Sequence, residues 1–429
     1  MIWALREEAQ RQGVGIMTDR SLMTALSRWE NNRNTPDQFY RRLLGVVLGL
    51  PIAEDFAVRT STYEQDVDRA IEALDVLTRW DHEERPVFTS AVGLVETDRV
   101  ISGYLFARSH AVDDSTPAPT SVAGQQDSVA GRIRVAVSAL MSVDFDQGGG
   151  RVRTALMHYF QNSVIPELRA ERVGDRRRAV YGAGAEVAQL LGWSAYDAGH
   201  QPVAARYFTL GLRLADEASD QLMGARLLAN LSHQYNSIGN YPQALTMARA
   251  AQAALRGRGT ASVETLCVMM EARALANLRD ERAASQAIGH AERLFDRRSD
   301  DEPDWIGYYD AAELSGDIAH AFRDLGVATR SREYTQRALT PTTPRRTRAF
   351  IQLVDAGSAL KCGDIEEAAS LATGALGSGG GLQSQRYLRY LQGFCRSVPD
   401  LRHPAMAEFT DIVSARYPKL LRPGEARRA

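Results

Sequence analysis

A short stretch near the N-terminus carries side chains suited to contacts with a nucleic acid. Arg20, Thr24 and Arg28 are spaced by four residues, so they line one side of any helix that includes them, with Ser21 and Ser27 beside them. An arginine can donate a bidentate pair of hydrogen bonds to guanine, and hydroxyls can meet base edges or phosphates. This ridge predicts a helix that enters the major groove of DNA. The alternative interpretation is an ordinary solvated helix face.

Residue patterns for catalysis are missing from the sequence. No two of the eight histidines lie three or four residues apart, so a metal site on one helix is not expected. There is no Gly-x-Ser-x-Gly elbow, no P-loop and no dinucleotide-binding glycine fingerprint. We therefore expect neither an enzyme nor a cofactor. An enzyme built on a helical scaffold is the third and least favoured interpretation.

The polar ridge needs a helix with an apolar side opposite it. Leu22, Leu26 and Trp29 recur at i, i+4 and i+7 and supply that apolar stripe. The asparagine-rich stretch 31–34 is predicted to end the helix, because asparagine tolerates turn conformations. A second helix is predicted to start at Pro36, since proline is favoured at the first helical position.

This helix pair resembles a known DNA-binding unit. The segment DRSLMTALSRWENNRNTPDQFYRRLLGVVLGL, residues 19–50, resembles the second half of a Cro/CI-type helix-turn-helix domain of the xenobiotic-response-element family. The match lies in Ser27-Arg28-Trp29-Glu30 and in the Pro-led segment 36–50, whereas Asn32 stands where the family has glycine. The resemblance implies that Trp29 packs in a small core. It implies contacts with double-stranded DNA for Arg20, Ser21, Thr24, Arg28 and Arg33.

In that family two helices precede the DNA-reading helix. Residues 1–12 can supply one of them, so we expect the helix-turn-helix domain, residues 1–58, either to lack its first helix or to begin upstream of Met1. One such module reads only a few base pairs. The resemblance therefore also implies a homodimer that binds two half-sites.

Small residues recur at fixed distances from a series of turns in the second half of the chain. The predicted turns are at Gly199, Gly239, Arg279, Gly326 and Gly363. Five residues after each turn come Ala204, Ala244, Ala284, Ser331 and Ala368, and twelve residues after each come Gly211, Ala251, Ala291, Ala338 and Ala375. Helices that cross closely need small side chains at the crossing. The spacing therefore predicts stacked helix–turn–helix units.

Two of these units, residues 190–215 and 230–251, resemble the tetratricopeptide repeat, an antiparallel helix pair. The resemblance implies an all-α fold with a small N-terminal helix-turn-helix domain and an α-solenoid of tetratricopeptide-like helix pairs. We expect a helical connecting region at 59–178 with a loop at 113–127, repeats at 179–380, and C-terminal capping helices and a tail at 381–429. The whole chain resembles actinobacterial regulators with this organisation.

Composition is that of a globular protein without a membrane segment. No apolar run approaches the roughly 18–20 residues that span a bilayer. The three cysteines have no metal-ligand spacing, so we expect reduced thiols and a cytoplasmic location. A net charge of −2 argues against a chain that coats nucleic acid, yet it allows one small DNA-reading domain.

Stacked helix pairs form a concave groove that typically receives a peptide or a partner helix. The candidates for contacts with such a protein or peptide ligand are polar residues of the first helix of a unit, namely Asp197, His233, Gln234, Asn236 and Arg273. The alternative for each of them is a solvated side chain.

Two further clusters have both a structural and a binding interpretation. Trp305, Tyr308 and Tyr309 are predicted as the core side of a helix, with ligand binding as the alternative. The arginine runs at 176–178 and 345–348 are predicted as solvated helix starts or turns, with phosphate binding as the alternative.

The sequence favours a cytoplasmic transcriptional regulator. Its helix-turn-helix is expected to bind DNA, and its repeats are expected to sense a peptide, small molecule or partner protein and to mediate self-association. The alternative is a protein-interaction adaptor that no longer binds DNA.

Overall fold

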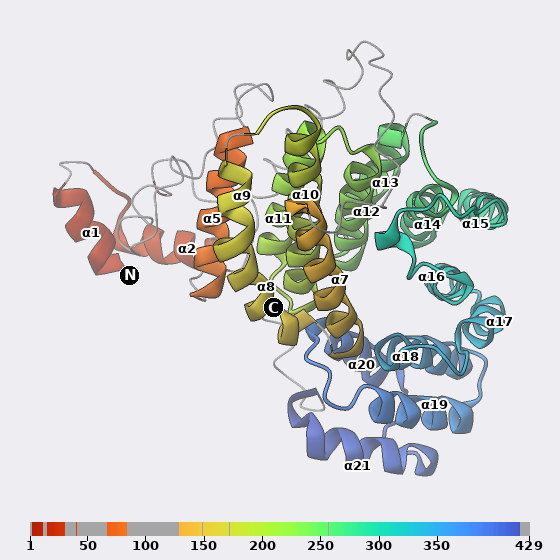
Figure 1. Cartoon of the computed structure of the whole chain (residues 1–429). Helices are drawn as coiled ribbons and strands as arrows, with labels where there is room; N and C mark the ends of the chain where they lie inside the picture. Colours follow the sequence, from red (N-terminus) through yellow and green to blue (C-terminus); the bar gives the residue numbers. More distant parts are fainter. Residues whose placement is uncertain are drawn as a thin grey trace.

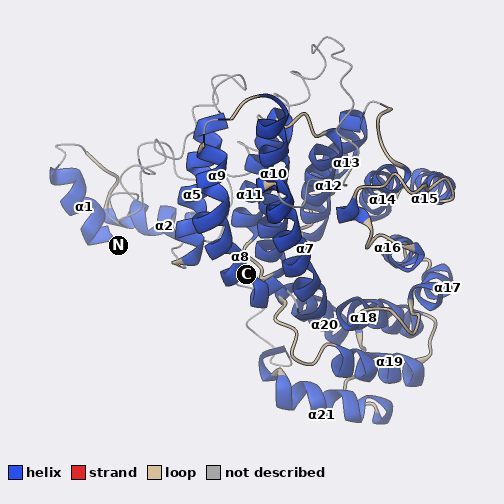
Figure 2. Ribbon diagram, viewed as in Figure 1, coloured by secondary structure: helices blue, strands red, loops and turns tan. Residues whose placement is uncertain are grey.

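The computed structural model describes residues 2–11, 15–30, 40, 67–83, 128–147, 149–170, 172–255 and 257–420. Within these ranges the regular structure is helical and no strand occurs (Figure 2), so the predicted all-α class is confirmed. None of the helices in the described ranges is long and apolar enough to cross a membrane.

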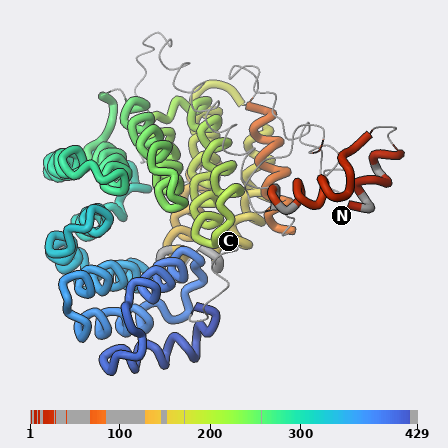
Figure 3. Tube along the Cα trace, turned by 180° about the vertical axis from the view of Figure 1, so that it is seen from behind, coloured from red at the N-terminus to blue at the C-terminus, as the bar shows by residue number. Residues whose placement is uncertain are grey.

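The helices that precede the repeats are α1 (Ile2–Arg11), α2 (Asp19–Glu30), α5 (Val67–His82), α7 (Val129–Gln147), α8 (Gly149–Tyr159), the π-helix η1 (Phe160–Val164) and α9 (Ile165–Arg169). α1 and α2 bury Leu5 and Leu22 together with Tyr40 in a hydrophobic cluster of their own. An ion pair between Arg6 and Asp19 joins α1 to the first turn of α2. In Figure 3 these two helices lie on the opposite side of the molecule from α14–α17.

The repeats begin with the helix pairs α10 (Gly174–Asp197) and α11 (Gln201–Glu217), α12 (Gln221–Ser237) and α13 (Tyr241–Leu255), and α14 (Ala261–Asn277) and α15 (Glu281–Phe295). A 3₁₀ turn η2 (Asp304–Ile306) leads into α16 (Ala311–Leu325) and α17 (Ala328–Ala338), followed by α18 (Arg345–Lys361) and α19 (Ile365–Ser378). The chain continues with α20 (Gln385–Ser397), η3 (Pro404–Met406), α21 (Ala407–Arg416) and η4 (Pro418–Leu420).

The turns inside the pairs lie where the small-residue spacing places them. All the predicted turn residues have positive φ: Gly199 (92°), Gly239 (84°), Arg279 (65°), Gly326 (89°) and Gly363 (87°). A left-handed residue ends a helix because it lets the last carbonyls accept hydrogen bonds, and glycine adopts it without strain. The small residues five and twelve positions later are all buried, as predicted. Ser331 donates from its hydroxyl to the Ala319 carbonyl oxygen at 3.0 Å and so joins α17 to α16.

The helix pairs follow an arc whose inner layer is formed by the even-numbered helices (Figure 1). α10, α12, α14, α16, α18 and α20 contact one another in sequence, and each of α11, α13, α15, α17 and α19 packs outside its own partner. One hydrophobic core runs from α5 to α18, and a second one continues from α18 to α21. α7 and α8 cover α10, and α5 packs on α11.

The arc turns far enough for its end to meet its beginning. α18 contacts α7, and α20 contacts α10, although these helices are far apart in the sequence. Figure 1 shows α18 and α20 returning beneath α7 and α10. The helices of the inner layer therefore surround a common interior.

The crossing of α10 and α11 gives the first testable prediction. A Cβ atom at Gly192 would lie 2.5 Å from a ring carbon of Phe208, so Gly192→Ala should lower the free energy of unfolding by about 1–3 kcal/mol through overpacking. Gly357 is also inside a helix, but a Cβ there meets nothing within 4 Å. Gly357→Ala should therefore stabilise by about 0.5–1 kcal/mol, because alanine loses less backbone entropy. Urea unfolding of both variants checks the two signs, and equal effects would contradict the close crossing.

Candidate functional site

The interior of the arc contains a cavity of about 140 Å³. Its wall comes from α7 and from each helix of the inner layer, together with the turn before α16. On α12 the lining residues are Arg226, Asn230 and His233, which recur at i, i+4 and i+7 and so share one face of the helix. On α14 the same spacing places Arg273 beside Met270. Repetition of the unit thus brings polar side chains from many helices to one place.

A buried ion-pair network closes the arc next to this cavity. We call Asp144, Asp197, Arg346 and Arg386 the closure network. Asp197, at the end of α10, is completely buried and accepts from Arg346 Nη2 at 2.7 Å and from Arg386 Nε at 3.2 Å. Arg346 Nη1 donates to Asp144 Oδ2 at 2.9 Å. Arg346 of α18 is therefore held by α7 and α10 together.

The network also fixes the start of α20. Ser384, the N-cap residue of α20, accepts from the Tyr387 backbone nitrogen at 3.1 Å and donates to Asp197 Oδ1 at 3.0 Å. The Arg386 guanidinium lies over the Phe350 ring at 4.2 Å from its centroid. Burial raises the pKa of the Asp144 carboxyl, and the Arg346 guanidinium opposes that rise. These groups hold the two ends of the arc together through charge-assisted hydrogen bonds.

Arg226 is a buried cation in the cavity wall that has no carboxylate partner among the described residues. Only 5 % of the residue is exposed. Its guanidinium lies 4.6 Å from the centroid of the Trp305 ring and 5.7 Å from that of Tyr308, and it donates to the Trp305 carbonyl oxygen at 3.3 Å. Burial lowers the pKa of Arg226, and the largest opposing influence is Tyr308. Glu186, whose charge also opposes the fall, pairs with Arg134 at 2.7 Å.

Several polar atoms of the cavity wall have no hydrogen-bond partner within the described part of the protein. They are Asp144 Oδ1, Arg226 Nε, Asn230 Nδ2, His233 Nδ1, Arg273 Nε and Arg346 Nε. Buried polar groups are normally satisfied, and each one left unpaired costs free energy of folding. Such a concentration at one cavity indicates a place built to receive a polar molecule.

An acidic group faces these donors from α16. Tyr309 donates from its hydroxyl to Asp317 Oδ2 at 2.9 Å, and Arg273 Nη1 donates to Asp317 Oδ1 at 3.1 Å. Glu313 lies one turn before Asp317 and accepts from Thr347 Oγ1 at 3.0 Å. Burial and the neighbouring Asp317 raise the pKa of Glu313 to about 7. Glu313 is therefore a proton acceptor or donor within the cavity near neutral pH.

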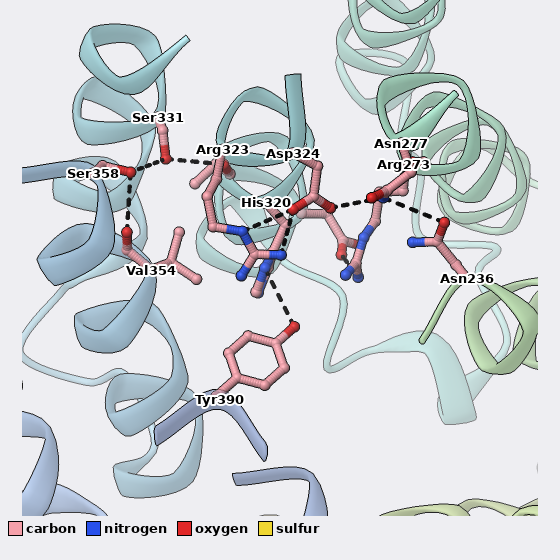
Figure 4. Close-up of polar contacts among 12 residues, drawn as sticks. Asn236, Arg273, Asn277, His320, Arg323, Asp324, Ser331, Val354, Ser358 and Tyr390 are labelled. Carbon is pink, nitrogen blue, oxygen red and sulfur yellow. Dashed lines mark hydrogen bonds and ion pairs between the residues drawn. The ribbon is translucent and has the colours of Figure 1, made fainter. Parts of the chain in front are cut away.

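Polar contacts link α12, α14, α16 and α20 (Figure 4). Asn277 Nδ2 donates to Asp324 Oδ2 at 2.9 Å and to Asn236 Oδ1 at 3.4 Å. Arg323 pairs with Asp324 and lies over the Tyr390 ring at 5.3 Å from its centroid. These contacts link successive helices of the inner layer and support the cavity from one side.

Two histidines complete the wall. The Tyr390 hydroxyl lies 3.5 Å from His320 Nδ1, and the ring of His233 lies 5.4 Å from that of Trp193. Burial and the nearby Arg273 guanidinium lower the pKa of both His233 and His320 well below its usual value. Both imidazoles are therefore neutral at physiological pH and can each supply one donor and one acceptor.

Of the residues predicted to face the groove, some line the cavity and the others do not. His233 and Arg273 line the cavity. Asp197 does not, because it is buried in the closure network. Gln234 is also buried, and its amide donates to the Gln201 carbonyl oxygen at 2.5 Å. Asn236 does not line the cavity either, and its side-chain oxygen accepts a hydrogen bond from Asn277 of α14. Position 234 lies one residue step of about 100° beyond His233 and so leaves its face of α12, whereas position 236 stays near that face but lies almost one turn further along the helix.

The other predicted clusters also need correction. Trp305, Tyr308 and Tyr309 do not form one side of an α-helix, because they lie in η2 and the turn before α16, where Tyr308 and Tyr309 line the cavity. Arg177 lies at the surface, as predicted, and pairs with Glu217 at 2.9 Å. Arg346 is not solvated: it is 3 % exposed, because two carboxylates compensate its burial.

The candidate DNA-binding residues of α2 lie on its surface. The structure describes the side chains of Arg20, Ser21, Thr24 and Arg28, and all four are exposed, whereas Leu22 is buried. The guanidinium groups of Arg20 and Arg28 make no hydrogen bond or ion pair with the described residues. Arg33, the side chain of Trp29, and the helix predicted from Pro36, apart from Tyr40, lie outside what the structure describes. The loop predicted at 113–127 also lies outside it.

Comparison with known proteins adds no assignment: no protein-family model and no curated protein matches this sequence. The α2 surface and the cavity are the two features that bear on function. Sequence reasoning missed Arg226 and Asn230. Their spacing with His233 was the available signal, because an inner helix repeats polar residues at i, i+4 and i+7 just as a core helix repeats apolar ones.

Removal of one charge from the closure network should open the arc. Asp197→Asn leaves Arg346 and Arg386 buried without their shared carboxylate, so the free energy of unfolding should fall by about 3–5 kcal/mol. Glu333→Gln breaks an exposed pair with Arg330 and should change stability very little. Urea unfolding gives the comparison, and small-angle X-ray scattering should show a larger radius of gyration for Asp197→Asn alone. An unchanged stability would contradict closure by this network.

The raised pKa of Glu313 predicts a dependence of stability on pH. The folded protein binds this proton more tightly than the unfolded chain, so the contribution is fully present below the ordinary pKa of 4.5 and is lost as pH rises through about 7. The stability advantage of Glu313→Gln over the unchanged protein should therefore grow by on the order of 3 kcal/mol between about pH 4.5 and about pH 8. Urea unfolding at both pH values measures it, with the exposed Glu281→Gln as the control. A constant difference would rule out the raised pKa.

Proposed function

We propose that this protein is a DNA-binding transcriptional regulator in which a tetratricopeptide-like α-solenoid receives a signal. The DNA-reading unit is the helix-turn-helix that contains α2. The signal site is the cavity inside the arc. The protein acts without catalysis of its own, through binding at two places.

The observation that carries the proposal is the exposed edge of α2. Arg20, Thr24 and Arg28 lie on one side of the helix and are exposed, while Leu22 on the other side is buried against α1. The Thr24 hydroxyl donates to the Arg20 carbonyl oxygen at 3.0 Å, which leaves its lone pairs as acceptors. Both arginines have their guanidinium donors available for guanine or phosphate. The resemblance of residues 19–50 to the xenobiotic-response-element family supports the same assignment.

The cavity supports the signal-receiving part of the proposal. Its wall combines helices from both ends of the arc, and Arg346 belongs both to that wall and to the closure network. A ligand that binds more tightly to one curvature of the arc than to another shifts the population toward it. A homodimer converts such a change into a new spacing of its two DNA-reading helices, and that spacing decides whether both half-sites can be contacted.

DNA binding is testable with the full chain. Arg20→Ala combined with Arg28→Ala should weaken binding to a duplex selected from pooled genomic fragments by roughly tenfold or more per arginine, because each guanidinium can contact a base pair. Fluorescence anisotropy at fixed salt measures the affinity. The matched control is Arg282→Ala combined with Arg297→Ala, which removes two exposed arginines, one in α15 and one in the turn after it, and should leave the affinity unchanged.

Two outcomes would count against the regulator. Equal affinity of the two double variants would show that α2 is not the DNA-reading helix. If the intact chain selects no duplex at all, even with an N-terminal extension from the upstream reading frame, the protein is an interaction adaptor whose repeats bind a partner.

A further inference from the structure

Arg226 stands apart from the other arginines of the cavity wall. Arg273 pairs with Asp317, and Arg346 and Arg386 pair within the closure network. Arg226 has aromatic rings, the Trp305 carbonyl oxygen and the Tyr308 hydroxyl beside it, and its Nε has no partner within the described part of the protein. Among the described residues, Arg226 is thus the arginine of the cavity wall that has no ion pair with a carboxylate.

Such an arrangement is unfavourable for the empty protein. A buried guanidinium without a counter-ion costs free energy because it has lost its hydration. A methionine or leucine at the same position would pack against Trp305 without that cost. A negative group that arrives from outside would offset that cost. Asn230, one turn further along α12, adds an amide nitrogen without a partner on the same face.

The remaining lining limits the size and character of the molecule. A dry protein cavity of about 150 Å³ is known to hold benzene, and this cavity measures about 140 Å³. Besides its polar groups, which include the carboxylates of Asp144, Glu313 and Asp317, the wall has apolar and aromatic side chains, with Leu266, Met270, Phe350 and Ile351. This space fits one ring. It is too small for a peptide of several residues, because drug-sized ligands already occupy pockets of roughly 300–1,000 Å³.

We propose that the cavity binds a small aromatic carboxylate, with its carboxylate paired to Arg226 and Asn230 and its single ring against Met270 and Phe350. The inference rests on the proposed function for its biological role, since it names the class of signal. The binding itself is independent of DNA. Arg226 is thus a ligand-binding residue that the protein retains at the expense of its own stability.

Benzoate is the probe for the full-length protein, and benzamide is its neutral match. Saturation-transfer NMR should detect benzoate with a millimolar or tighter dissociation constant, and benzamide should bind at least tenfold more weakly. Arg226→Met should weaken benzoate binding by about ten- to a hundredfold, as expected for loss of a hydrogen bond to a charged group. Arg249→Met is the matched control, because Arg249 pairs with Glu271 and its side chain is 62 % exposed.

A second measurement separates a binding role from a structural one. Without ligand, the melting temperature of Arg226→Met should equal or exceed that of the unchanged protein, because an uncompensated buried charge has been removed. Benzoate should raise the melting temperature of the unchanged protein and of Arg249→Met, and it should leave that of Arg226→Met in place.

Three results would overturn the inference: no binding of benzoate at millimolar concentration, equal binding of benzoate and benzamide, or equal binding of benzoate by the unchanged protein and Arg226→Met. None of these measurements involves DNA. A protein that binds benzoate through Arg226 but selects no duplex therefore keeps this inference and loses the proposed function. A protein that selects a duplex but does not bind benzoate through Arg226 keeps the proposed function and loses this inference.

Discussion

The shape of the interior depends on one completely buried carboxylate. Asp197 accepts hydrogen bonds from α18 and α20 while it belongs to α10, so it joins the beginning of the helix stack to its end. A solenoid whose units contact only their neighbours has no need of such a contact. Here the contact brings α7 and α10 against α18 and α20, so that all four contribute to the wall of one partly open cavity. The buried polar groups of the wall are held at low dielectric, where unpaired charges are costly and paired ones are strong.

Much of the repeat architecture could be predicted because it is locally determined. A left-handed turn and two small residues at helix crossings are requirements of a single helix pair, and the sequence meets them each time. Arg279 shows the limit of residue identity: it takes positive φ without being glycine, and only its spacing from the other turns marks it. Closure was not predictable in this way. Arg346 and Asp197 are 149 residues apart, and their meeting depends on the accumulated curvature of the intervening pairs.

The cavity was only partly predictable, for a related reason. The sequence places His233 and Arg273 on first helices of units. One residue step turns an α-helix by about 100°, so Gln234, next to His233, points away from the cavity. Trp305 was assigned to a helix because aromatic spacing alone cannot distinguish a regular helix from a 3₁₀ turn. Its contact with Arg226 bridges 79 residues and is a tertiary property. Whether a buried arginine lacks a counter-ion can be known only when all its neighbours are placed.

The unpaired polar groups of the cavity wall and the closure network influence each other electrostatically. Arg346 lines the cavity and pairs with both Asp144 and Asp197, so a negative charge placed near Arg226 also changes the electrostatic potential at the network. Asp144 belongs to α7, which packs on α10 at the beginning of the stack. A ligand need not push any element to have an effect there. It suffices that the closed arc neutralises the ligand better than an open one, because a ligand shifts a conformational equilibrium only by its difference in affinity for the two states.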